Sequence, residues 1–73
     1  MKKLIVEYLK MNARCWYKNK FDAMELSLFG LSDFFPIEVL NVAFGAFSGS
    51  NEEFVALAKD AFELALKEEE GND

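Results

Sequence analysis

The stretch Ser50-Asn51-Glu52-Glu53, which opens the segment SNEEFVALAKDAFELALKEE at residues 50–69, decides the fold. Ser50 and Glu53 have the spacing of a capping box, in which each side chain accepts a hydrogen bond from the other residue's backbone amide. Apolar residues then recur at helical spacing, which predicts a helix over Asn51–Glu69. The acidic tail at 68–73 is expected to fray. The residues predicted to face the core are Phe54, Leu57, Ala58, Ala61 and Ala65.

The preceding segment, Pro36 to Phe47, is predicted to form a second helix. Proline suits the first turn of a helix because its missing amide has no intrahelical partner there. Ser48-Gly49-Ser50 is read as the turn between the two helices, with Gly49 free to adopt a positive φ. The two segments therefore predict an antiparallel helical hairpin. Its first helix is expected to face inward through Ile37, Leu40, Phe44 and Phe47.

The N-terminal twenty residues fit two patterns. Leu4, Ile5, Tyr8 and Leu9 share one helical face, as do Asn12, Cys15 and Trp16 further along. The runs at 4–6 and 15–17 also suit strands. Residues 21–35 are similarly open, because a short helix ending at Gly30 competes with alternation at 24–28. The leading prediction is a mostly α domain with the hairpin packed on an N-terminal helix. The alternative is an α+β domain with an N-terminal β-hairpin or meander followed by two helices.

The length of the chain, 73 residues, predicts one domain over 1–73. It contains one cysteine and no histidine, so an intrachain disulfide cannot form and the common zinc sites are excluded. Apolar residues make up 52% of the chain, including eight phenylalanines. So small a domain cannot bury that many large side chains completely, which favours self-association or a protein partner. We therefore expect a homo-oligomer.

Charge is divided unevenly along the chain. Residues 1–20 hold six cations against one acid, a net of +5, whereas residues 21–73 hold two cations against twelve acids, a net of −10. Such a field can orient a partner, or pair the basic end of one copy with the acidic end of another.

Catalytic chemistry finds little support in this sequence. Arg14 and Lys18 flank Cys15 and would lower a thiol pKa, but no histidine is present to act as its base. The simpler interpretation of Cys15 is a small buried apolar residue. The carboxylates lie on polar faces and look solvated, and the spacing of a calcium loop is absent. We therefore expect a protein that is not an enzyme and that holds no metal or cofactor.

The densest apolar stretch, residues 29–42, predicts the binding surface. Part of it must be core, and the remainder is available for a partner, since aromatic anchors dominate binding energy at interfaces. The hypothesis is a small regulator or inhibitor that binds another protein. The proposed interface is Phe34, Phe35 and Val39, flanked by Asp33 and Glu38.

Two alternatives involve nucleic acid. In the first, cations neutralise phosphates while an aromatic ring stacks on bases, and the residues concerned are Arg14, Trp16, Lys18 and Lys20. In the second, the thirteen carboxylates imitate a phosphate backbone and occupy the groove of a nucleic-acid-binding protein. In size and charge alone, the chain is similar to small acidic inhibitors from phages and mobile elements. The competing interpretations are an N-terminal segment anchored by Trp16 and an ordinary solvated acidic surface.

The sequence also indicates the cellular compartment of the protein. The longest uncharged stretch, 39–51, is shorter than the roughly 20 residues that a membrane span needs. Glu7 interrupts the apolar run after Lys3, which makes a poor signal peptide. The unpaired cysteine and the missing targeting signal predict the reducing cytoplasm.

Overall fold

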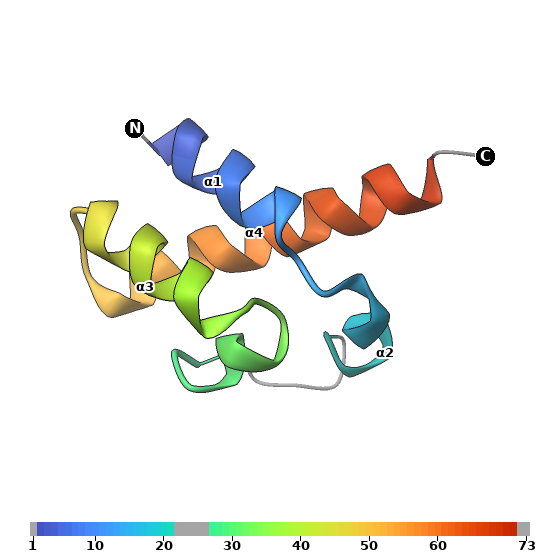
Figure 1. Ribbon diagram of the computed structural model, residues 1–73, viewed down its shortest axis with the longest axis horizontal. Helices are drawn as coiled ribbons and strands as arrows, with labels where there is room; N and C mark the ends of the chain where they lie inside the picture. Colours follow the sequence, from blue (N-terminus) through green and yellow to red (C-terminus); the bar gives the residue numbers. More distant parts are fainter. Residues whose placement is uncertain (1, 22–26, 72–73) are drawn as a thin grey trace.

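The computed structural model describes residues 2–21 and 27–71, and for 20 and 21 it describes the backbone only. The described part is mostly helical and contains no strand, so the leading fold prediction is confirmed and the β-hairpin alternative is wrong. The prediction of a helix or strand over 24–28 lies largely outside the described residues. The elements, in chain order, are α1 (Lys2–Met11), η1 (Cys15–Tyr17), α2 (Lys18–Phe21), η2 (Gly30–Asp33), α3 (Ile37–Ala46) and α4 (Asn51–Glu70) (Figure 1).

Helix α4 runs the length of the molecule and carries much of the core (Figure 1). The capping box forms as predicted, since the Glu53 amide donates to Ser50 Oγ at 3.2 Å and the Ser50 amide donates to Glu53 Oε1 at 3.1 Å. These bonds satisfy two amides that a helix start otherwise leaves unpaired. The helix continues to Glu70, so residues 68–70 remain helical. Its buried face is Phe54, Leu57, Ala58, Ala61, Phe62 and Ala65.

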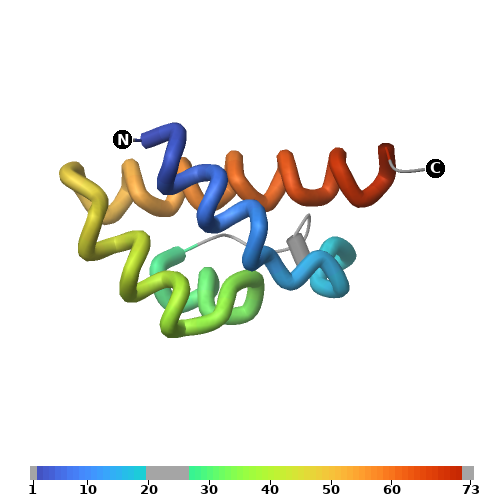
Figure 2. Tube along the Cα trace, turned by 45° about the horizontal axis from the view of Figure 1, so that its top comes forward, coloured from blue at the N-terminus to red at the C-terminus, as the bar shows by residue number. Residues whose placement is uncertain are grey.

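Helix α1 packs across α4 and also contacts α3, as Figures 1 and 2 both show. It buries Ile5 and Leu9, which lie one turn apart, while α4 buries Ala58, Ala61 and Ala65 along with its larger apolar residues. The distance between packed helices depends on the size of the side chains at their contact. Beyond its end, the Arg14 amide donates to the Phe34 carbonyl oxygen at 2.7 Å. This bond fastens the N-terminal segment to the connector that follows residue 27.

Two adjacent phenylalanines fill the centre of the core. Phe34 and Phe35 follow the 3-10 helix η2, and both approach Phe62 of α4 edge-on, with ring centroids 4.9 Å and 6.2 Å apart. Leu31, within η2, is buried beside them. A short connector without helical periodicity therefore contributes three of the largest fully buried side chains.

Helix α3 begins where the sequence indicated but presents a different face to the core. Pro36 occupies the N-cap position, so the helix begins one residue later than predicted. Leu40 points inward as expected, but Ile37 is 58% exposed and Phe44 is also largely exposed. Val39 and Ala43 are buried in their place. The predicted inward face was therefore wrong for Ile37 and Phe44. Because α3 is apolar almost all the way round, its periodicity does not choose between the two faces.

The turn between α3 and α4 uses Gly49, but not for the positive φ that the sequence predicted. No described glycine has a positive φ, so Gly49 is not required for a left-handed conformation. A Cβ at Gly49 would lie 2.7 Å from the Phe47 ring, which folds back over the turn. Phe47 in turn contacts Phe54, with ring centroids 5.6 Å apart. Gly49 therefore makes room for the ring that closes the hairpin.

The two charged halves of the chain meet within one molecule. Lys10 of α1 forms ion pairs with Glu7 at 2.9 Å and with Glu68 of α4 at 2.8 Å. Hydrogen bonds to Glu68 and then to Glu7 raise the pKa of Lys10. Part of the charge asymmetry seen in the sequence is thus neutralised between α1 and α4. Fewer unpaired charges then remain to attract the basic end of one copy to the acidic end of another.

Candidate protein-binding surface

The apolar residues of the predicted interface lie inside the chain. Phe34, Phe35 and Val39 are each less than a tenth exposed and belong to the core, whereas Asp33 and Glu38 lie on the surface. A partner of the folded chain therefore meets the two acids but not the three apolar side chains. The reason is the connector, which folds into η2 and turns both phenylalanines toward α4.

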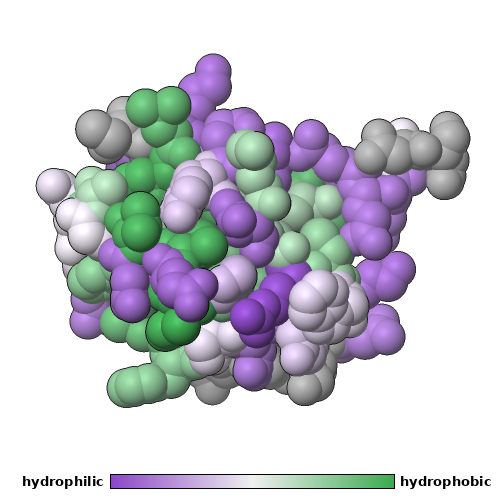
Figure 3. Space-filling view, in the orientation of Figure 1, coloured by the Kyte–Doolittle hydropathy of each residue, from purple (hydrophilic) through white to green (hydrophobic). Residues whose placement is uncertain are grey.

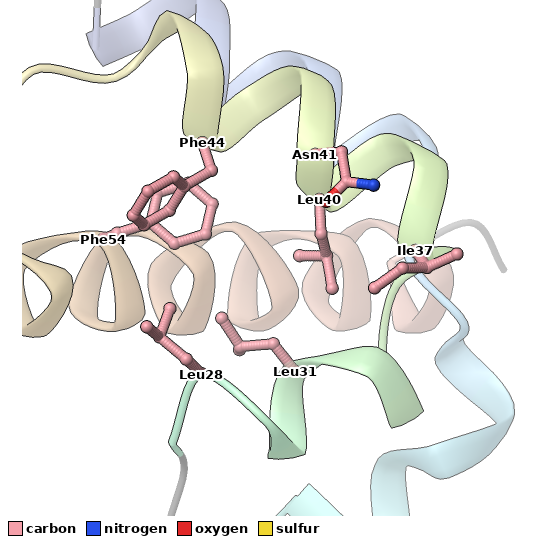
Figure 4. Close-up of a pocket in the computed structure, with 7 residues that line it drawn as sticks. All are labelled: Leu28, Leu31, Ile37, Leu40, Asn41, Phe44 and Phe54. Carbon is pink, nitrogen blue, oxygen red and sulfur yellow. The ribbon is translucent and has the colours of Figure 1, made fainter.

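An apolar groove opens on the surface next to these residues. It has a volume of about 220 Å³, and Figure 4 shows its walls converging from α3, from the segment before η2 and from the start of α4. Leu31, Leu40 and Phe54 are buried and form its floor, whereas Ile37 and Phe44 rise at its edges. Phe44 leans on Phe54 edge-on, with ring centroids 5.0 Å apart. The full lining is Leu28, Leu31, Ile37, Leu40, Asn41, Phe44 and Phe54.

A second hollow adjoins the groove at Leu28, which lines both. It has a volume of about 520 Å³, and Phe29, which is 92% exposed, stands at its edge. Its other lining residues are Ser27, Asn51, Glu52 and Val55. The two hollows share Leu28 in their linings, and we call the pair the α3 groove.

The sequence contained the signal for this groove but not its position. Ile37 and Phe44 were assigned to the inner face of their helix, and Phe29 was noted only as part of the apolar stretch. The useful signal was the excess of apolar residues in that helix. A helix that is apolar on all sides leaves some apolar residues exposed, because the core covers only part of its surface.

Helix α1 presents another exposed apolar surface. Leu4, Tyr8 and Met11 follow one another at helical spacing on the side away from Ile5 and Leu9, and all three are exposed. In Figure 3 apolar atoms gather over the N-terminal part of α1 and over α3. We call Leu4, Tyr8 and Met11 the α1 stripe. Unlike the α3 groove, it is the outer side of a single helix.

The predicted nucleic-acid residues are only partly gathered together. Trp16 is 72% exposed on η1, so it does not anchor the core, and Lys18 is exposed beside it at the start of α2. Arg14 has a structural role, since its Nη1 donates to the Ser32 carbonyl oxygen at 3.4 Å. Lys20 lies in α2, but its side chain is outside the described part.

Cys15 is not activated by its basic neighbours. Partial burial, followed by a hydrogen bond and charge interaction with Glu69, raises the pKa of its thiol. Arg14 and Lys18 do not lower that pKa, in contrast to the effect that the sequence suggested. A raised thiol pKa disfavours the thiolate, which is the nucleophilic form.

Within residues 2–21 and 27–71, no three histidine, cysteine or acidic side chains come together as a metal site would require. Over the same residues, no helix combines the length and the apolar character needed to cross a bilayer. Comparison with protein-family models, curated proteins and solved structures finds no match.

Proposed function

We propose that this protein is a small non-enzymatic binding protein, a regulator or inhibitor, whose α3 groove takes an apolar segment of a larger protein. One observation carries the proposal. Ile37 and Phe44 stand exposed on either side of a floor made of buried core residues. A few residues, often aromatic, carry most of the binding energy at protein interfaces.

The shape of the groove favours a protein partner over a small molecule. Ligand sites usually enclose about 300–1,000 Å³ and surround most of the ligand. The two hollows measure about 220 Å³ and about 520 Å³, and both are open to solvent instead of enclosed. Open hollows of this kind suit the side chains of a docked segment.

Site-directed photo-crosslinking tests this function. A photo-reactive phenylalanine analogue placed at position 37 should yield a discrete adduct in an extract of the producing cells. The same analogue at Glu63, on the outer face of α4, should not. Adding Phe44→Asp should abolish the adduct, and Leu4→Asp on the α1 stripe should leave it intact. An adduct that forms equally at 37 and 63, or that survives Phe44→Asp, would mean that the groove is not the binding surface.

Nucleic-acid binding through the basic N-terminal segment is the second candidate, favoured by the exposure of Trp16. Stacking on single-stranded DNA would quench the fluorescence of this residue, the chain's one tryptophan. Affinity would also fall steeply with added salt. Unchanged emission with DNA at low salt would remove this candidate.

A further inference from the structure

The described lining of the α3 groove contains one acid and no cation. Among the described residues, neither hollow has a lysine or arginine in its lining. Glu52 lines the second hollow, and Glu38 is exposed next to Ile37 at the end of the first. The nearest cation along α4 is Lys59, one helical turn after Val55 and outside the lining. Most of the positively charged residues are in α1, at Arg14 and in α2.

The way in which a segment can bind here is also restricted. Partner segments commonly add a strand to a sheet edge or lay an amphipathic helix into an apolar groove. The described residues contain no strand to which another could be added. Proline-rich segments dock between several exposed aromatic rings, whereas this groove presents one exposed ring in each hollow, Phe44 in the first and Phe29 in the second. The helix-in-groove mode remains, with anchors one and two turns apart entering the two hollows that meet at Leu28.

We propose that the partner segment is a cationic amphipathic helix, whose apolar stripe fills the α3 groove and whose lysines or arginines pair with Glu38 and Glu52. This inference rests on the proposed function, because it names the chemistry of the segment that the groove binds. The apolar contacts supply the affinity. The two acids favour a positively charged helix and set its orientation in the groove. Exposed charges at an interface contribute more to specificity than to affinity.

The test compares two designed helical peptides with the same leucine stripe, one carrying lysines on its polar face and the other glutamates. Binding of each labelled peptide is followed by fluorescence anisotropy. We expect the lysine peptide to bind roughly tenfold or more tightly than the glutamate peptide. Glu38→Lys combined with Glu52→Lys should remove or reverse that preference. Glu63→Lys combined with Glu70→Lys, an equal change of charge at exposed positions of α4 outside the groove, serves as the matched control and should alter it little.

The outcomes separate the two proposals. If both peptides bind equally and Ile37→Asp abolishes both, the groove function stands and the charge inference fails. A lysine-peptide preference that Glu63→Lys reduces as much as Glu52→Lys would reflect net charge alone, and would also overturn the inference. Failure of both peptides to bind excludes an amphipathic helix as the occupant. Binding that Ile37→Asp leaves untouched would count against the groove itself.

Discussion

Replacing Ile37 and Leu40 separately by alanine tests which face of α3 is buried. The apolar pattern alone places both side chains inward, whereas in the structure Leu40 is 7% exposed and Ile37 is 58% exposed. Removing a buried leucine side chain costs about 2–5 kcal/mol, because both the transfer free energy and the packing around the cavity are lost. Leu40→Ala should therefore remove a large part of the roughly 4–11 kcal/mol expected for a chain of this length.

Ile37→Ala should cost much less. Complete burial of an isoleucine side chain is worth about 1.5–3 kcal/mol, of which roughly two-fifths applies here. Alanine recovers a few tenths of a kcal/mol through its higher helix propensity. The net loss should be about 0.5 kcal/mol, and it should not exceed about 1 kcal/mol.

Urea denaturation followed by far-UV circular dichroism measures the difference. For a urea slope of about 1 kcal/mol per M, Ile37→Ala should lower the midpoint by about 0.5 M and Leu40→Ala by about 2 M or more. Equal shifts, or a larger shift for Ile37→Ala, would refute the assignment of Ile37 to the surface and with it the wall of the groove.

The further predictions concern other parts of the chain. Ser50→Ala should cost about 1 kcal/mol of unfolding free energy at pH 7. The Ser50 backbone amide, followed by its side chain, lowers the pKa of Glu53, so the contribution of this carboxylate is present above the ordinary glutamate pKa and is lost as the pH falls below it. The difference in unfolding free energy between Glu53→Ala and the parent in pH-dependent urea melts should therefore narrow below about pH 4. Cys15 should react with iodoacetamide more slowly than a free thiol at pH 8, and Glu69→Gln should speed that reaction, whereas no change would contradict the role of Glu69. Leu4→Lys should reduce any concentration-dependent rise in mass measured by light scattering, and an unchanged rise would exclude the α1 stripe as the self-association surface.

The sequence predicted the helices better than their faces. Helix α4 was predictable because Ser50 and Glu53 mark its start by a local hydrogen-bond pattern that needs no tertiary contact. Helix α1 was ambiguous because the branched residues of its first turns suit a strand equally well. Packing against α4 decides in favour of a helix, and that contact joins residues far apart in the chain.

The candidate site could be predicted only in part. The apolar stretch at 29–42 and its acids Asp33 and Glu38 were recognised, but the division between core and surface within it was not. Phe34 and Phe35 are buried because the connector turns at η2, and a 3-10 turn leaves no periodic pattern to read. Ile37 is exposed because of the rotation of α3 about its own axis. That rotation is set by the helices that pack against α3, and the sequence of α3 alone does not specify it.

The most direct test of a cationic helix in the α3 groove is an amide NMR titration of the labelled protein with the leucine–lysine peptide. The account predicts that the largest shift changes fall at Leu28, Ile37, Asn41 and Phe44, with little change at Glu63. Changes centred on α1 and η1 around Trp16, or no changes at all, would contradict it.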